Sequence, residues 1–213
     1  MDLRLEHLEY KWHQLMARQR APTRYIVPLW REIVSAYSSK SRYFHTLKHL
    51  GDLLHQAELH QDKIRDYDTL LLSIWYHDII YQCLRKDNEE KSAIFAKYRL
   101  EAIKYPRTGI VKCYQQINAT KLNNPVINNI DGDTALFLDF DQSVLGSKWM
   151  HYKEYAKSIR REYAIFPTFL YNRGRKKLLQ LLLKKEKLFV TELYYNSFEA
   201  IARDNIKKEL SLL

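Results

Sequence analysis

The sequence predicts an all-α fold of nine or ten helices in a single domain, 1–213. Glycine and proline number only 5 each, well below their usual joint share of about 12 %, which argues against turn-rich β architectures. Hydrophobic residues make up 46 % of the chain and recur at helical spacing, whereas strand-like alternation is hard to find. This content, with 16 tyrosines, can bury enough apolar surface to exclude a disordered chain.

Helical periodicity places the elements in order along the chain. Leu50, Leu53 and Leu54 fall on one helical face, and Leu71 and Ile74 do the same farther along. A cluster of Asn, Pro and Gly marks a turn within 123–133. The expected helices are 2–20, 24–38, 46–60, 67–84, 88–104, 109–121, 133–145, 149–164, 167–186 and 188–211.

We expect a helical core at about 40–146, with C-terminal helices over 149–213 packed on it. The first residues are charged and do not form a signal peptide. The longest apolar runs, 70–76 and 178–183, are far shorter than the ~18 residues of a spanning helix. Only two cysteines are present, so reduced thiols are expected. These features predict a cytoplasmic protein with no membrane partner.

The net charge of +10 is concentrated in the last third of the chain. Residues 142–213 contain 15 Lys and Arg against 7 Asp and Glu, a balance of 15 − 7 = +8. Such a surface can attract phosphate-bearing ligands, nucleic acid or an acidic membrane face, or it can simply be a set of solvated helix faces. Nucleic acid is not favoured as a partner, because no recognised nucleic-acid-binding motif accompanies the charge.

Three groups of polar residues interrupt apolar segments. His45 and His49 are four residues apart, a spacing that places them on one face of a helix. The pair His77-Asp78 lies in an apolar stretch, where a carboxylate needs a partner. A further acidic group, at 139 and 141, lies in another apolar segment and also calls for a cation.

The order of these groups is more informative than any one of them. His49 and His77 are 28 residues apart, and Asp78 and Asp141 are 63 apart, each on its own apolar segment. Imidazole and carboxylate ligands together suit one divalent ion such as Mn, Fe, Ni, Co, Zn or Mg and leave room for water and a phosphate oxygen. The alternative is a metal-free network of hydrogen bonds between buried His and Asp side chains.

The arrangement resembles the HD superfamily of metal-dependent phosphohydrolases, which are all-α proteins. The likeness extends to one bacterial branch of that superfamily and covers nearly the whole chain. The segments that carry it are 42–49, 75–81, 87–93, 137–146, 159–163, 174–175 and 198–205.

The resemblance implies that His49, His77, Asp78 and Asp141 are the metal ligands, with Asp141 favoured over Asp139 for the last position. It implies a phosphoester substrate, a phosphorylated small molecule that is nucleotide-like. Alongside Asp78, His45 and Glu89 are expected to act in catalysis.

His45 matches the position of a general-acid histidine in related phosphodiesterases; the alternative is that it hydrogen-bonds a ligand carboxylate and orients it. Glu89 would position a water molecule, or it simply opens a helix whose N-cap is Asp87.

One departure from the branch supports a different function. The branch commonly has a histidine shortly after a threonine in the helix that precedes the acidic pair, whereas Thr120 is followed by Asn123 and Asn124 and by no histidine. The competing hypothesis is therefore a regulatory module that has the HD fold, binds metal or nucleotide, and is catalytically impaired.

Overall fold

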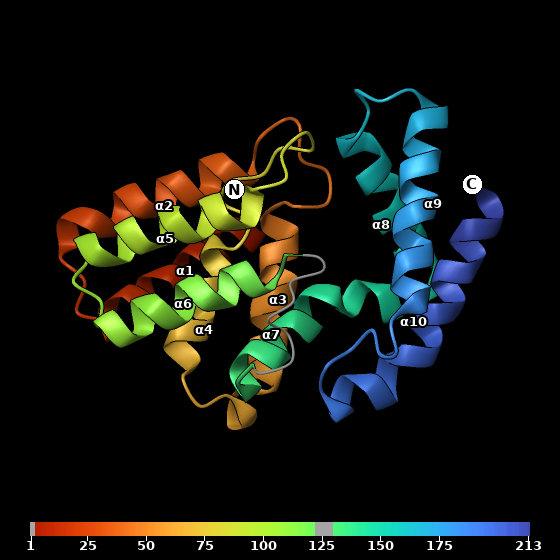
Figure 1. Cartoon of the computed structure of the whole chain (residues 1–213). Helices are drawn as coiled ribbons and strands as arrows, with labels where there is room; N and C mark the ends of the chain where they lie inside the picture. Colours follow the sequence, from red (N-terminus) through yellow and green to blue (C-terminus); the bar gives the residue numbers. More distant parts are fainter. Residues whose placement is uncertain (1–2, 122–129) are drawn as a thin grey trace. The chain divides into compact units, whose positions relative to one another are not determined.

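The computed structural model describes residues 3–121 and 130–213, and over these ranges it confirms the all-α prediction (Figure 1). Ten α-helices and short 3-10 turns make up the described chain. The helices are α1 (Leu3–Arg18), α2 (Thr23–Tyr37), α3 (Leu47–Leu59), α4 (Tyr67–Tyr76), α5 (Asn88–Ala102), α6 (Arg107–Ala119), α7 (Gly132–Gln142), α8 (Trp149–Glu162), α9 (Thr168–Lys184) and α10 (Glu192–Leu212).

The chain divides into two compact units, Met1–Thr134 and Ala135–Leu213. That the two form the single domain expected from the sequence stays a prediction. Among the described residues, no helix combines the length and the apolar character needed to cross a membrane.

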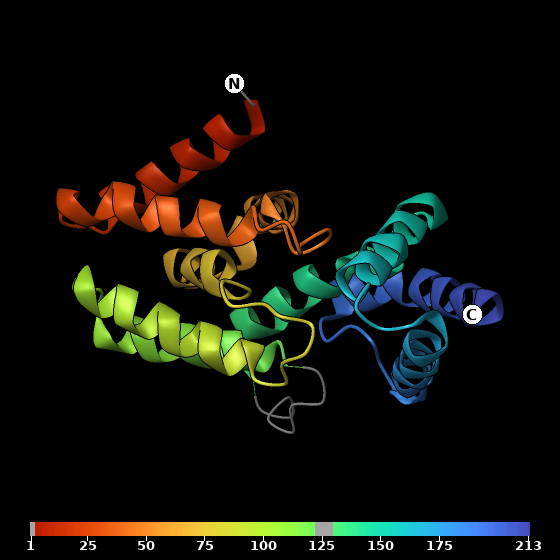
Figure 2. The same ribbon diagram turned by 90° about the horizontal axis from the view of Figure 1, so that it is seen from above.

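In the first unit, α4 lies in the middle, between the α1–α2 pair and the α5–α6 pair (Figure 2). The ring of Trp75 in α4 packs edge to face against Trp12 of α1 and Trp30 of α2. The ring centroids are 5.7 Å apart in the first pair and 5.9 Å apart in the second. On the opposite side, Ser73 donates a 2.6 Å hydrogen bond to Gln116 of α6. A helix covered on both sides needs apolar residues nearly all round, which its sequence supplies.

The sequence predicts a helix over 67–84, but α4 ends well before that. After the helix, the backbone N–H of Asp78 donates to the Tyr37 hydroxyl at 3.1 Å. The Ser92 hydroxyl accepts from the N–H of Ile80 and donates to its carbonyl, both at 3.1 Å. These distant side chains satisfy backbone groups that a longer helix would have used, so the chain can turn without glycine or proline.

In the second unit, α10 packs against the 3-10 turn Ser143–Gly146 and against α8 and α9. Gly146 makes the first of these contacts possible, because a Cβ at this position would lie 2.5 Å from the Cβ of Phe198. The periodicity predicts that the last helix begins at 188, but α10 begins at Glu192.

A buried carboxylate explains this later start. Asp139 accepts hydrogen bonds from the N–H groups of Val190 and Thr191 at 2.7 and 2.8 Å, and from the Thr191 hydroxyl at 2.5 Å. Thr191 then serves as N-cap, its side chain accepting from the N–H of Tyr194 at 3.3 Å. The residues before Thr191 are therefore held in a loop and do not join the helix.

Candidate metal centre

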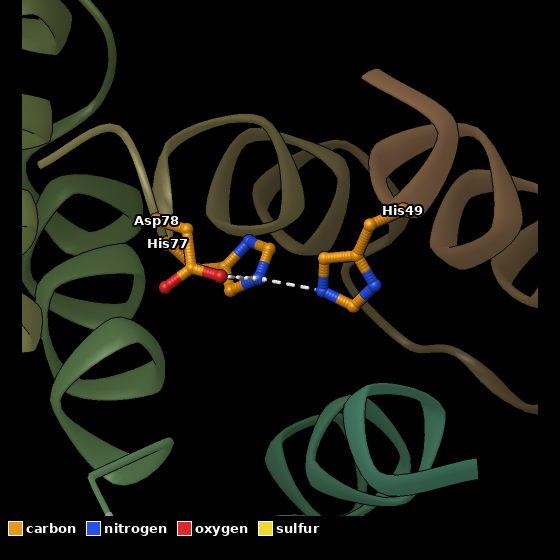
Figure 3. Close-up of side chains that lie close together, drawn as sticks. All are labelled: His49, His77 and Asp78. Carbon is orange, nitrogen blue, oxygen red and sulfur yellow. Dashed lines mark hydrogen bonds and ion pairs between the residues drawn. The ribbon is translucent and has the colours of Figure 1, made fainter. Parts of the chain in front are cut away.

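The end of α4 and the start of α3 bring together His49, His77 and Asp78, three of the four expected metal ligands (Figure 3). His49 lies in the first turn of α3, and His77 immediately follows α4. Both histidines are buried, at 5 % and 1 % exposure, and Asp78 next to them is partly accessible. Their apolar neighbours along each helix fill the core, so the two helices fix the imidazoles in place.

Three potential metal-ligand atoms face one another in this cluster. His77 Nε2 lies 3.3 Å from His49 Nε2 and 3.0 Å from Asp78 Oδ2. One ligand atom from each residue can be chosen so that all three lie within 4.8 Å of one another. Among the described residues this is the group of His, Cys, Asp and Glu side chains with the spacing of a metal site.

The other ring nitrogen of His77 is already engaged. Its Nδ1 lies 2.8 Å from the carbonyl oxygen of Ile74, an acceptor that requires a proton on Nδ1. In the neutral ring the lone pair is therefore on Nε2, the atom that faces His49 and Asp78. A backbone carbonyl that fixes the tautomer in this way is a common partner of metal-binding histidines.

The electrostatics of the cluster favour a charged carboxylate. Burial raises the pKa of Asp78. The positive charge of protonated His77, followed by that of His45 and His49, has the stronger, opposite effect and holds the pKa below its usual value. The carboxylate is thus ionised and is available as an anionic ligand at neutral pH.

His45 reaches the same cluster from outside the helix. The four-residue spacing predicts that His45 and His49 share a helical face, but α3 begins at Leu47, so this prediction is wrong for His45. The reason is the extended backbone of Thr46, whose N–H donates to the Phe44 carbonyl at 2.8 Å. Even so, His45 Nε2 lies 3.9 Å from Asp78 Oδ2.

Arg42 holds this part of the chain against the loop that follows α4. Its guanidinium donates to the carbonyl of His45 at 3.2 Å and to the carbonyl of Ile79 at 3.1 Å. It also lies over the rings of Tyr37 and Tyr81, 4.8 and 5.6 Å from their centroids. Arg42 therefore links the backbone beside His45 to the backbone beside Asp78.

Sequence reasoning assigned no role to Arg42 or to Tyr81, although both lie in segments that resemble the HD motifs. The ring of Tyr81 stacks on His45 with centroids 4.0 Å apart and planes 30° apart. The two hydrogen bonds of Arg42 to the carbonyls of His45 and Ile79 form a clamp between the two segments. Its signal is the burial of Arg42, which is not visible in the sequence.

Glu89 lies in the first turn of α5 and is half-buried. It does not belong to the three-residue group of potential ligands among the described residues. Asp87 occupies the N-cap position as predicted, but its carboxylate pairs with Arg85 at 2.8 Å and makes no capping hydrogen bond. Glu89 as a water-positioning base stays a prediction.

The two acidic candidates at 139 and 141 have different surroundings. Asp139 is fully buried, and both of its oxygens accept hydrogen bonds from Val190 and Thr191. It is thus committed to the scaffold of the second unit. Asp141 is half-exposed in the same unit, and its role as the last ligand stays a prediction.

Protein-family models, curated proteins and solved structures were each compared with the chain, and none of the three comparisons found a match. The likeness to the HD superfamily therefore stays a prediction. The position where the branch would carry its additional histidine, near Asn123, lies outside the described residues.

Chemically, the cluster can hold a cation or share protons. Two histidine nitrogens and an ionised carboxylate form a ligand set for a first-row divalent metal. Without a metal, a proton between the facing nitrogens would give a hydrogen-bonded His–His–Asp network. These two states differ in metal content, which makes the choice between them experimental.

Proposed function

We propose that this chain is a metal-dependent phosphohydrolase that acts on a nucleotide-like phosphoester. The observation that carries the proposal is the convergence of His49, His77 and Asp78, whose ligand atoms all lie within 4.8 Å of one another. The sequence resemblance to HD phosphohydrolases supports the reaction and the substrate class. It also supports Asp141 as the fourth ligand.

Two of the three pairs of ligand atoms have the spacing that a shared ion requires. Two ligand atoms each about 2.05 Å from one metal lie about 3.3 Å apart in tetrahedral geometry and about 2.9 Å apart in octahedral geometry. The nitrogens of His77 and His49 are 3.3 Å apart, and His77 Nε2 and Asp78 Oδ2 are 3.0 Å apart. The protonated Nδ1 of His77 adds the remaining requirement, a lone pair on Nε2.

When bound, a divalent ion supplies Lewis acidity and lowers the pKa of coordinated water. The chain's own residues supply the proton. His45 is half-buried beside Asp78 and can hold a proton at Nε2, which Asp78 stabilises. Transfer of this proton to the departing oxygen would complete hydrolysis. The stacked ring of Tyr81 keeps the imidazole oriented for that transfer.

The test is an activity screen with nucleotides and generic phosphoesters in the presence of Mn, Ni, Co or Mg. His45→Ala is expected to lower turnover by about 10²–10⁴-fold while metal content stays unchanged. The loss should be smallest for a nitrophenyl ester, because nitrophenolate needs little protonation to leave. His151→Ala is the matched control, since His151 is exposed on α8.

Two outcomes would argue against the proposal. If His45→Ala weakens metal binding by about 10–100-fold and slows all substrates alike, His45 orients a ligand instead of donating a proton. If the wild-type chain binds metal and nucleotide but turns over no phosphoester, the regulatory module is the better account.

A further inference from the structure

The corner between α8 and α9 comprises the loop and the start of α9, residues 163–170, and Arg160 holds several of its groups. Arg160 donates to the carbonyl of Tyr163 at 3.0 Å and to the carbonyl of Phe166 at 3.1 Å. It also reaches the hydroxyl of Thr168 at 3.3 Å and lies over the ring of Tyr171, 4.7 Å from its centroid. These hydrogen bonds hold the backbone of the corner in place. Its outward-pointing side chains therefore stay exposed.

Those outward side chains are large and apolar. Ile165 is 66 % exposed, Phe169 is 70 % exposed and Leu170 is 45 % exposed. Leaving such side chains in water forgoes the favourable free energy of burying them. Single exposed apolar residues are ordinary, but three within six positions on a rigid corner form a patch that favours a partner.

Basic residues follow the apolar corner on the same face of α9. Arg173, Lys176 and Lys177 are exposed, and their spacing from Phe169 places them on its side of the helix. At 1.5 Å per residue they lie within about 12 Å of Phe169 along the axis. The helix contains no acidic residue, and within the described ranges these three cations have no ion-pair partner.

We propose that this corner docks on an anionic lipid surface, with Ile165, Phe169 and Leu170 inserted at the headgroup boundary. An apolar tip next to a group of cations is the pattern of interfacial membrane binding. Two of the three apolar side chains, Ile165 and Leu170, are aliphatic and cannot stack on bases as nucleic-acid binding requires, so a lipid surface is the better match. The proposal revises the sequence-based expectation of no membrane partner and is independent of the proposed hydrolase activity.

The test is co-sedimentation of the full chain with vesicles of phosphatidylcholine alone or of phosphatidylcholine and phosphatidylserine in equal parts. Binding is expected only to the second kind and should weaken as salt is raised. The triple variant Arg173→Gln, Lys176→Gln, Lys177→Gln is expected to weaken binding by about 100-fold, roughly fivefold per charge. The double variant Ile165→Ser, Phe169→Ser should weaken it by at least about tenfold.

Matched controls separate the corner from general surface properties. Met150→Ser removes an apolar side chain that is 65 % exposed on α8, outside the corner, and should leave binding unchanged. Replacing the exposed Lys40, Lys86 and Lys207 by glutamine removes the same charge elsewhere and should have a small effect. All variants change exposed side chains, so their melting temperatures should match the wild type.

Three results would overturn the proposal. One is the absence of binding to phosphatidylserine vesicles. A second is binding that Ile165→Ser, Phe169→Ser leaves unchanged, which would reduce the interaction to charge alone. The third is tighter binding to an oligonucleotide than to the vesicles, with the same loss in the triple variant, which would assign the cations to nucleic acid.

Discussion

The His49–His77–Asp78 cluster of the first unit and the carboxylates Glu199 and Glu209 of the second unit have different surroundings. Glu199 and Glu209 each have dedicated donors. Glu199 accepts from the N–H groups of Leu188 and Phe189 and from Arg203. Glu209 is bonded by Arg175 through two nitrogens at 2.8 and 3.0 Å and by the Tyr152 hydroxyl at 2.6 Å.

In the first unit, by contrast, the buried polar side chains of the cluster face one another. When the ring of His77 is neutral, its Nε2 carries the lone pair and points at a second imidazole nitrogen and at a carboxylate oxygen. Groups with complementary donors stabilise a fold, whereas acceptors that converge on one point call for a cation. The comparison therefore separates the scaffold of the second unit from the candidate site of the first.

The largest expected effect is at the site itself. Asp78→Asn keeps the shape of the side chain but removes its charge. We expect its metal affinity and its turnover to fall by more than ~10–100-fold, which is the typical effect of removing a hydrogen bond to a metal ligand. Metal content per chain and kcat/KM measure this. Asp52→Asn is the control, because Asp52 is exposed and pairs with Lys48 at the surface; equal behaviour of the two variants would contradict the prediction.

The second unit should respond in stability and not in metal binding. Arg175→Met leaves the buried carboxylate of Glu209 without its cation, and breaking a buried pair of this kind costs about 3–5 kcal/mol. Thermal unfolding measures the loss. Lys157→Met, which removes an exposed pair with Glu154, should leave the melting temperature unchanged. A loss of metal in Arg175→Met without a loss of stability would contradict the prediction that the second unit affects stability and not metal binding.

An intermediate effect is expected at Arg42, which belongs to the scaffold of the site. Arg42→Lys keeps the charge but cannot make both of the divergent hydrogen bonds to His45 and Ile79. Metal affinity should fall by about 10–100-fold, and excess metal should restore much of the activity. Arg24→Lys, an exposed arginine beside Tyr25, is the control. Unchanged affinity in Arg42→Lys would show that the clamp does not position the ligands.

The smallest effect concerns pH. Burial raises the pKa of Asp133, but Lys112 at 2.6 Å and the N–H groups of Arg65 and Asp66 together hold it below its usual value. Because the folded-state pKa is depressed, this stabilisation is fully present above the unfolded pKa of about 3.9 and is lost as pH falls through the folded value.

Asp133→Asn should therefore lower stability by about 1–3 kcal/mol at neutral pH, and by progressively less below about pH 4. Unfolding curves of both proteins over this range measure the difference. A difference that stays constant with pH would mean that the charge of Asp133 does not contribute.

Most helices were predictable, because their apolar faces repeat locally along the sequence. The two clear misses, the end of α4 and the start of α10, have a common cause. In each case the backbone is diverted by side chains distant in sequence: Tyr37 and Ser92 for the first, Asp139 for the second. Local periodicity carries no information about such partners.

The candidate site was predictable in its residue types but not in its support. His49, His77 and Asp78 stood out because polar residues interrupt apolar segments, and the structure brings them together. The contact of Arg42 with two backbone carbonyls and the stacking of Tyr81 on His45 depend on tertiary packing alone. The same applies to Asp139, whose burial among donors distinguishes it from Asp141.

The most direct test of the central claim is the metal content of the chain purified without chelator and then equilibrated with excess divalent ion. We expect one tightly held ion per chain in the wild type and loss of that ion in His49→Ala. His55→Ala, which changes an exposed histidine on the same helix, should retain it. A wild-type chain that holds no ion with Mn, Fe, Ni, Co, Zn or Mg would contradict the account and leave the cluster as a hydrogen-bonded network.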